Sequence, residues 1–407
     1  SEGFIQWMEQ VTGIEDLRRD KVDLFSALYG PTDHLLCHND ELQDRRVAFI
    51  LYLVDRDWAV EDGGLLEFFD TEEGVNHPCA DPPVSLLPSF NSFAFFNVRP
   101  DSWHQVGEVT GQRQRLTVSG WYRGPPLAKP PYAEMPSTPF LNPTVLEEGS
   151  ALLQQWVNPL YLSLETQSQV QQQFCEESSL ELPQFLRPEA FGRLVQGLME
   201  GGGDDTSTIQ SGWKWWHRGP PNRRNFFAIT PVEDLPECKR PAAVPAGADS
   251  SSADVVQEFL SLLRSTTFAT LMSTLCAMPI QEGHLSVEGR RFDRGGYTLL
   301  QDFLKKEEGL DCPGLDVVLT CNPAPFTSEH QGGFLTYTSE EEHLLTVLPQ
   351  PNTLSVVFRD EGCMRFVKFL NCTAPGPRLD FSLVYRDFPL PDSSSSDEEE
   401  EQSSQEG

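Results

Sequence analysis

Leu35-Leu36-Cys37-His38-Asn39-Asp40 is the stretch on which the interpretation of this chain depends, because it places a histidine and an aspartate two residues apart. In a β-strand, side chains at this spacing point to the same face, so His38 and Asp40 can reach one metal ion together. A further histidine, His104, follows at domain distance. Two imidazoles and one carboxylate form the facial triad that holds Fe(II) and leaves the opposite face open. His38, Asp40 and His104 are therefore candidate iron ligands.

Arg115-Leu116-Thr117-Val118-Ser119-Gly120-Trp121 adds a candidate for binding a co-substrate. The period of a strand places Arg115 on one face with Thr117 and Ser119. A planar guanidinium can bind both oxygens of a carboxylate. Because three protein ligands leave room on the metal for a bidentate 2-oxo acid and O2, we expect Arg115 to hold the far carboxylate of such a co-substrate.

Other interpretations stay open on the residues alone. A single His-x-Asp often arises by chance, and the chain contains 8 histidines. The three residues could be ordinary surface side chains of a β domain. They could also hold a hydrolytic zinc ion, although such a site would not need Arg115. The setting favours the iron site, because the hydrophobic runs 47–54 and 92–98 read as buried strands.

Short hydrophobic runs separated by Gly, Pro and Asp turns predict a mainly β fold for residues 1–126, the expected catalytic domain. Their number and length are typical of a double-sheet jelly roll, the cupin-like double-stranded β-helix. The strands are expected at 22–29, 34–38, 47–54, 65–69, 84–87, 92–98, 103–106 and 115–122.

The region 284–388 repeats the pattern of the first domain. Gly332-Gly333 echoes Gly63-Gly64, and the strand that starts at Arg378 echoes the one that starts at Arg115. A second jelly roll is therefore expected.

The metal positions are not repeated in this second copy. Leu299-Leu300-Gln301-Asp302-Phe303-Leu304 stands where residues 35–40 stood, and the place of His104 falls near Phe366. We expect a degenerate jelly roll that binds no iron and serves as a scaffold, a substrate-docking module or a dimer surface.

Composition changes mark further segments. Trp213-Lys214-Trp215-Trp216-His217-Arg218 could stack on nucleic-acid bases, but we favour the interpretation that its tryptophans anchor the segment against the first domain. Serines before the acidic run of the tail would suit phosphorylation. The predicted segments are a Pro-rich linker with a helical, aromatic-basic connecting region (127–240), a disordered loop (241–253), the second jelly roll (254–390) and an acidic disordered tail (391–407).

Charge and cysteine usage limit the class of partner. A net charge of −31 argues against binding nucleic acid through its phosphates and favours basic partners. The 9 cysteines include no C-x-x-C pair, which indicates neither a disulfide framework nor a zinc site and favours the reducing cytosol or nucleus. No apolar run predicts a membrane span. The chain begins with Ser1 and a helix expected at 4–17 is already under way there, so we expect a fragment or a shortened isoform.

The quoted motifs resemble those of a known enzyme family. The runs 35–42, 45–54, 103–106 and 115–121 follow, in order and spacing, the eukaryotic 2-oxoglutarate- and iron-dependent prolyl 3-hydroxylases. These enzymes hydroxylate a proline of the small-subunit protein at the ribosomal decoding centre. The resemblance extends through nearly the whole chain, including the second half, where it implies a non-catalytic barrel.

The resemblance implies roles for individual residues and molecules. His38, Asp40 and His104 would bind Fe(II), and the co-substrate 2-oxoglutarate would be held by Arg115, Tyr52 and, along the pocket wall, Leu35. O2 and ascorbate would take part, and the substrate would be a basic ribosomal protein. A role in translation control or termination, a cytoplasmic and nuclear location and a homodimer are further expectations. The alternatives are the same chemistry on another residue (a lysine hydroxylase or a demethylase), or a non-catalytic interaction protein if the shortened first domain is inactive.

Overall fold

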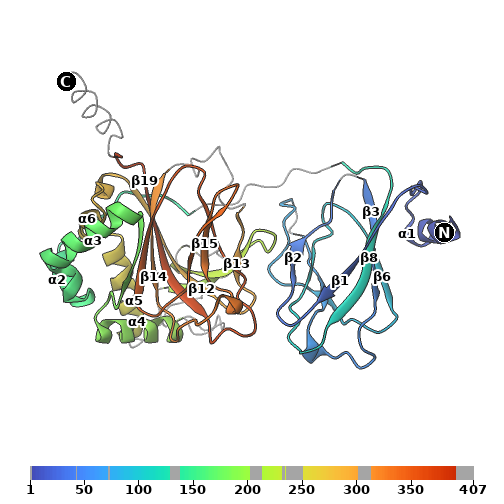
Figure 1. Cartoon of the computed structure of the whole chain (residues 1–407), viewed down its shortest axis with the longest axis horizontal. Coiled ribbons are helices and arrows are strands. Elements are labelled where there is room, and N and C mark those ends of the chain that lie inside the picture. Colours follow the sequence, from blue (N-terminus) through green and yellow to red (C-terminus); the bar gives the residue numbers. More distant parts are fainter. Residues whose placement is uncertain are drawn as a thin grey trace, which may run out of the picture.

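The computed structural model describes residues 2–42, 44–71, 74–128, 138–201, 213–231, 234, 251–300 and 313–390. Two β domains lie side by side, and helices flank the C-terminal one on the side away from its neighbour (Figure 1).

The first domain is a jelly roll of two antiparallel sheets, which confirms the predicted fold class. The strand order is β1-β8-β3-β6 in one sheet and β2-β7-β4-β5 in the other. The bounds of its strands are β1 Val22–Tyr29, β2 Leu35–His38, β3 Arg45–Tyr52, β4 Leu66–Phe68, β5 Val84–Leu86, β6 Phe93–Asn97, β7 His104–Val106 and β8 Arg115–Arg123.

Side-chain alternation turns a polar face of the first sheet inward. Along β8 the side chains of Arg115 and Thr117 are buried, while Leu116 between them is 36% exposed. Part of the outer face is covered by helix α1 (Glu2–Thr12), which buries Met8 against it. An inward arginine and threonine mean that the barrel interior is not a simple apolar core.

The second domain has the same strand order. Its sheets are β12-β19-β14-β17 and β16-β15-β18, and β13 lies against β18, where the Val367 N–H donates to the Thr298 hydroxyl. The bounds are β12 His284–Phe292, β13 Tyr297–Thr298, β14 Gly314–Thr320, β15 Leu335–Thr338, β16 His343–Val347, β17 Thr353–Arg359, β18 Met364–Val367 and β19 Arg378–Arg386. The predicted internal repeat is therefore a repeat of topology.

The first sheet of this domain is wider than expected. Strands β10 (Trp213–Arg218) and β11 (Arg224–Pro231) form a hairpin that extends one edge, and β9 (Ser179–Pro183) pairs with β17 at the other. The sequence pattern placed β9 inside a helical region. It is a strand because Leu180 and Leu182 alternate into the core, a period of two that a helix cannot produce.

Five α-helices among the described residues complete the core of the second domain. Trp156, Phe174 and Leu194, one from each of the first three, are buried in a single cluster with the sheet. This core begins well before the predicted boundary at residue 254, so much of the expected connecting region packs into the second domain. The bounds of the helices are α2 Gly149–Trp156, α3 Leu164–Glu177, α4 Pro188–Glu200, α5 Ser251–Leu263 and α6 Thr266–Cys276.

The tryptophans of the aromatic-basic segment anchor it, but against a different partner from the one expected. Trp213 and Trp215 are buried in the core of the second domain, not against the first. Strand alternation explains this, since both face inward from β10 while Lys214 between them is only partly buried.

Some predicted segments cannot be compared. The acidic tail 391–407 lies outside the described residues, as does most of the loop expected to be disordered at 241–253, of which 251–253 form the start of α5. Among the residues that are described, no helix has the length and apolar character needed to cross a membrane.

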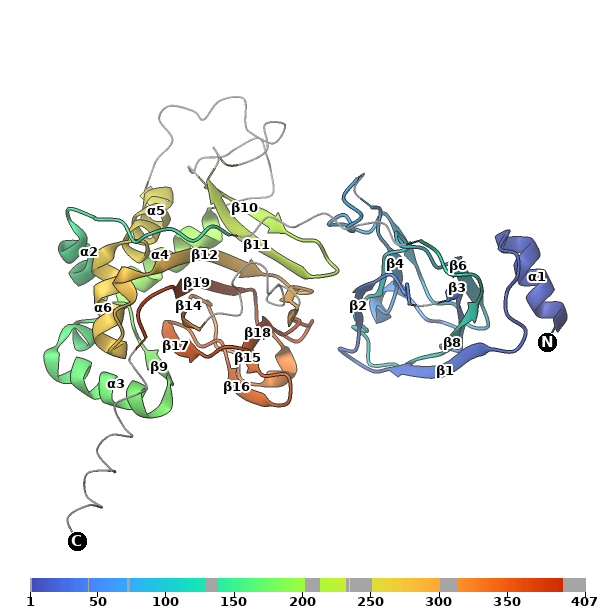
Figure 2. The same ribbon diagram turned by 90° about the horizontal axis from the view of Figure 1, so that it is seen from above.

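The two domains touch beside strand β2. The His34 ring stacks on Phe369 with ring centroids 3.6 Å apart, and the Cys372 N–H donates to both carboxylate oxygens of Glu108 at 2.8 and 3.0 Å. Seen from above, the tip of the β10–β11 hairpin reaches toward β2 (Figure 2).

Candidate metal centre and co-substrate pocket

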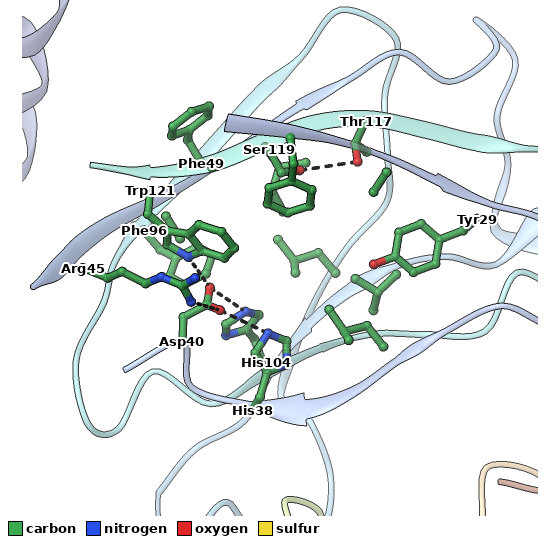
Figure 3. A pocket seen from close by; sticks show the side chains of 18 of the residues that line it. Tyr29, His38, Asp40, Arg45, Phe49, Phe96, His104, Thr117, Ser119 and Trp121 are labelled. Carbon is green, nitrogen blue, oxygen red and sulfur yellow. Dashed lines mark hydrogen bonds and ion pairs between the residues drawn. The ribbon is translucent and has the colours of Figure 1, made fainter. Parts of the chain in front are cut away.

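Strands β2 and β7 bring the two predicted histidines together. His38 ends β2 and lies directly opposite His104, the first residue of β7, with ring centroids 4.3 Å apart. Asp40 follows two residues after β2, and its carboxylate oxygens lie 3.3 Å from His38 Nε2 and 3.5 Å from His104 Nε2 (Figure 3). Ligand atoms from all three residues lie within 4.8 Å of one another.

A turn, and not the pleat of a strand, places Asp40. Its backbone φ is +60°, in the left-handed region that aspartate tolerates better than most residues. The i, i+2 spacing therefore predicted the right residues for a geometric reason that holds only in part. Strand β2 ends at His38, and the following turn directs the Asp40 carboxylate toward both imidazoles.

Backbone carbonyls fix the orientation of both imidazoles. His38 Nδ1 donates to the Leu36 carbonyl and His104 Nδ1 to the Ser102 carbonyl, each at 2.8 Å. Because a carbonyl can only accept, the proton of each neutral ring sits on Nδ1, and Nε2 keeps its lone pair. Both Nε2 atoms face Asp40, as in metal-binding histidines whose other ring nitrogen donates to a backbone carbonyl.

The carboxylate of Asp40 is held in its ionised form. Burial alone would raise its pKa, but His104 and His38, which can donate from Nε2 to the carboxylate once a ring is protonated, outweigh burial and hold the pKa well below the usual value. The indole Nε1 of Trp121 donates to Asp40 Oδ2 at 2.9 Å, and the Arg45 guanidinium lies 3.5 Å above the Trp121 ring. Burial also opposes the charged form of His38, yet its contacts with Asp40 leave its pKa raised overall.

A pocket of about 190 Å³ runs from this cluster to Arg115. Arg115 is 1% exposed, its Nε donates to the Gly64 carbonyl at 2.8 Å, and its Nη2 has no hydrogen-bond partner among the described residues. Burial lowers the pKa of Arg115, which reflects a cation without a carboxylate beside it. The pocket is lined by Phe25, Ala27, Tyr29, Leu35, His38, Asp40, Arg45, Ala48, Phe49, Ile50, Leu66, Phe96, His104, Val106, Arg115, Thr117, Ser119, Gly120 and Trp121.

The remaining predicted residues lie around Arg115 with different exposure. Leu35 lines the pocket and is 43% exposed. Tyr52 is 3% exposed, and its ring lies 5.2 Å from the Arg115 guanidinium. Burial raises the pKa of Tyr52. Tyr52 is not itself part of the pocket lining.

Sequence reasoning missed three contributors to this site. The Tyr29 ring also lies beside the Arg115 guanidinium, at 5.3 Å, and the Trp121 indole donates to Asp40. Gly64 has φ +67°, and a Cβ there would lie 2.7 Å from Arg115 Cδ, so the glycine makes room for the arginine. Trp121 could have been found, since it lies on the same face of β8 as Arg115; Tyr29 could not, because its place depends on the pairing of β1 with β8.

Strand pairing shows which residues of the second domain stand at the positions of the first domain's site. Leu66 pairs with Val106 and Phe68 with His104, just as Leu335 pairs with Val367 and Tyr337 with Arg365. The residue in the place of His104 is therefore Arg365, and not Phe366 as expected from the sequence. Similarly, β13 at residues 297–298 takes the place of β2, two residues earlier than expected, while 301–304 lie outside the described residues.

Aspartates and arginines in this second interior neutralise one another. Arg365 Nη1 lies 3.0 Å from Asp316 Oδ2, and Asp380 lies 2.7 Å from both Arg290 and Arg378. Among the described residues, the triad of the first domain is the single group of three with metal-ligand geometry.

Comparison with known proteins identifies the family. Residues 24–123 match the 2OG-Fe(II) oxygenase superfamily, and residues 148–388 match the family described as oxoglutarate and iron-dependent oxygenase degradation C-term. Prolyl 3-hydroxylase OGFOD1 of Mus musculus is 32% identical over 91% of this chain and 73% of its own length. Prolyl 3-hydroxylase OGFOD1 of Xenopus laevis is 32% identical over 91% and 71%. Prolyl 3,4-dihydroxylase OGFOD1 of Ostreococcus tauri is 28% identical over 95% and 81%.

A solved prolyl hydroxylase from Trichoplax adhaerens, in complex with a hypoxia inducible factor peptide, is 14% identical, covers 55% of this chain and 90% of its own, and has a TM-score of 0.34. The fold assignment rests on the strand pairing described above and not on this similarity.

The chain belongs to the family of 2-oxoglutarate- and iron-dependent oxygenases that contains the prolyl 3-hydroxylases named here. Fe(II) and 2-oxoglutarate are the metal and the co-substrate of this family.

Proposed function

We propose that this chain is a prolyl 3-hydroxylase whose first barrel holds Fe(II) and 2-oxoglutarate. The observation that carries the proposal is one pocket with His38, Asp40 and His104 at one end and the buried Arg115 at the other. A co-substrate with a 2-oxo acid at one end and a carboxylate at the other matches these two ends in chemistry.

The donor set fits ferrous iron. Two imidazole nitrogens and one ionised carboxylate form the triad typical of non-haem Fe(II) oxygenases, with positions left for other ligands. Both Nε2 atoms carry lone pairs, since each Nδ1 donates to a backbone carbonyl. No proton has to leave either neutral ring before a metal binds.

Each residue then has a definite task. Arg115 would bind the tail carboxylate through Nη2, a guanidinium atom with no partner among the described residues, and Tyr52, whose ring lies 5.2 Å from the guanidinium, would contribute its hydroxyl. Trp121 would keep Asp40 oriented, and Tyr29 would keep water from the guanidinium. Bound iron would supply oxygen activation, coupled to conversion of 2-oxoglutarate to succinate and CO2, and oxidation of a substrate C–H bond.

The proposed substrate is a proline of the small-subunit ribosomal protein at the decoding centre. The relatives named prolyl 3-hydroxylases support proline as the target residue. The net charge of −31 supports a basic protein as partner, because opposite charge speeds encounter and suppresses acidic competitors. A role in translation, a location in cytoplasm and nucleus, and ascorbate as the reductant that maintains Fe(II) are parts of the same proposal.

Mass spectrometry of a peptide around this proline tests the proposal. The peptide is incubated with the chain, Fe(II), 2-oxoglutarate and ascorbate, with His38→Ala in parallel. We expect a gain of one oxygen on proline, absent with His38→Ala. A gain of two oxygens would show the activity for which the Ostreococcus tauri relative is named. Succinate formation with an unmodified peptide would support the oxygenase activity but exclude this substrate. If a folded protein formed neither succinate nor hydroxylated peptide, the proposal would be contradicted.

A further inference from the structure

A second cavity, of about 540 Å³, lies between the two domains and leads to the metal cluster. Its walls come from both domains: six consecutive residues, 34–39, with Trp103 from the first, and Asn222 and Leu299 from the second. His38 and Leu35 line both this cleft and the co-substrate pocket, so the cleft is continuous with the site where oxidation would occur.

One wall of the cleft is the edge of a sheet. β2 is the outermost strand of the order β2-β7-β4-β5, and among the described strands it pairs with β7 alone. An edge strand presents backbone N–H and C=O groups to which an extended peptide can add by hydrogen bonding. From Leu35 to His38 the strand spans about 10 Å at roughly 3.3 Å per residue, which is room for about three residues of an extended chain.

The opposite wall is the tip of the β10–β11 hairpin, which the second domain holds in place. The Tyr297 hydroxyl donates to the Pro221 carbonyl, and the Leu299 N–H donates to the Arg223 carbonyl at 2.9 Å. Asn222 stands at this tip, and its Oδ1 is buried without a hydrogen-bond partner among the described residues. An unsatisfied buried acceptor costs free energy that a donor entering the cleft would recover.

The contacts between the domains define the ends of the cleft. The stack of His34 on Phe369 closes one end, and His38 at the other end belongs to the metal cluster. Both views show the hairpin tip next to β2 (Figures 1 and 2). A chain lying along β2 would therefore run from a closed contact between domains toward the reacting centre.

We propose that the substrate binds as an extended polypeptide segment between the two barrels, paired with the edge of β2, and that Asn222 of the second barrel is a specificity residue that accepts a hydrogen bond from its backbone. This rests on the proposed prolyl hydroxylation. It assigns the second barrel a direct part in substrate binding, and it makes an extended chain, not a free amino acid or a folded surface, the object that is recognised.

A rival path runs elsewhere on the first barrel. A groove lined by Asn97, Val98, Arg99 and Pro100 lies near the loop that Asn39 contacts through its hydrogen bond to the Pro100 carbonyl. Asn97 is exposed there, so it provides a matched asparagine for comparison with Asn222.

Steady-state hydroxylation of the ribosomal peptide by Asn222→Ala, Asn222→Asp and Asn97→Ala tests the inference, with thermal unfolding as the check of folding. Asn222→Ala should raise KM for the peptide roughly tenfold and leave KM for 2-oxoglutarate unchanged, as expected for loss of one hydrogen bond. Asn222→Asp retains an oxygen acceptor and should stay within about threefold of the unaltered chain. Asn97→Ala should have no effect on KM for the peptide.

Methylating the peptide one backbone nitrogen at a time adds a second arm. Pairing with a strand edge predicts that KM rises at alternate positions, because only every second N–H of an extended chain faces its neighbour. If Asn222→Ala hydroxylated the peptide with an unchanged KM, the inference would be overturned while the proposed function would stand. A rise in KM for the peptide confined to Asn97→Ala would have the same meaning. No hydroxylation by the unaltered chain would remove both the proposed function and the inference that rests on it.

Discussion

The two barrels share one strand order and have opposite interiors. In the first, small side chains leave a pocket between a metal-ligand cluster and a buried arginine. In the second, charged side chains from the same register positions meet and fill the space. The pairs, first barrel before second, are Ala27 and Arg290, Ala48 and Asp316, His104 and Arg365, Thr117 and Asp380.

This comparison teaches that the strand framework and the site are specified separately. Arg115 and Arg378 occupy the same position, opposite Tyr29 and Phe292 on the paired strands. Arg378 has a carboxylate partner in Asp380 at 2.7 Å, whereas Arg115 has a threonine at the corresponding place. The first barrel thus leaves a cation ready for an external carboxylate, and the second supplies the carboxylate itself.

Removing one carboxylate from each interior should give the largest contrast. Asp40→Asn should lower peptide hydroxylation at least about 100-fold, because it removes a metal ligand, with little loss of stability. Asp316→Asn should destabilise the fold by about 3–5 kcal/mol, since it leaves Arg359 and Arg365 buried without their shared carboxylate. Hydroxylation assays and urea unfolding measure the two effects. An active Asp40→Asn variant would contradict the assignment of the triad.

The two equivalent arginines offer the next test. Arg115→Ala should raise KM for 2-oxoglutarate about 10- to 100-fold, the effect of losing a hydrogen bond to a charged group. Arg378→Ala should leave that KM unchanged and lower the free energy of unfolding by about 3 kcal/mol, because Asp380 loses one of its buried partners. If both variants changed KM equally, the second interior would have to act on co-substrate binding.

How far the sequence predicted this molecule can be judged from the first barrel. All eight strands were predicted, and β1 was predicted with its observed ends, because alternation and turn residues are local signals. The triad was predicted because two of its members lie in one short stretch. The role of Gly64 beside Arg115 was not predicted, because the spatial contact between residues so far apart depends on strand pairing.

The second barrel shows where local patterns stop being informative. Its topology repeat was visible, but the sequence placed the residue that replaces His104 only near Phe366, and the strand pairing shows that it is Arg365. A shift of one residue moves a side chain to the other face of a strand, so only the observed pairing of Arg365 with Tyr337 decides between the two. The ion network around Asp316 joins strands distant in sequence and leaves no local signal.

Lowering the pH should weaken metal binding in the first barrel before it disrupts the ion pairs of the second. Metal and proton compete for His38, whose pKa is raised, so metal affinity should fall about tenfold per pH unit once the pH drops below that pKa. Without metal, the raised pKa stabilises the fold at low pH and this contribution is lost as pH rises through it. The pKa of Asp380 is lowered: burial opposes this, but Arg290 and Arg378 outweigh burial.

The stability that Asp380 contributes depends on pH in the opposite direction from that of His38, so the second barrel serves as the control. Its contribution to stability is present above the ordinary aspartate pKa and is lost only as pH falls through its lower native value. Between pH 7 and pH 5 the second barrel should therefore keep its ion network while Mn(II), used as a redox-inert probe, is released. Calorimetric titration at several pH values measures this, and metal affinity independent of pH would contradict the histidine ligands.

The smallest expected effect concerns the orientation of Asp40. Trp121→Phe removes the indole donor at 2.9 Å and retains a ring beneath Arg45. Metal affinity should fall about tenfold, as for other partners that hold a ligand in place. Val384 occupies the matching position in the second barrel, so Val384→Ala is a paired control that should not change metal affinity. Unaltered affinity in Trp121→Phe would mean that Asp40 keeps its orientation without the hydrogen bond from the indole.

The stoichiometry of metal binding tests the central contrast most directly. Anaerobic titration with Fe(II), in the presence of 2-oxoglutarate, should show one ion per chain. His104→Arg, which installs the residue found at the same register in the second barrel, should abolish binding in a protein that remains folded. Two ions per chain, or one ion retained by His104→Arg, would contradict the account of one open and one filled barrel.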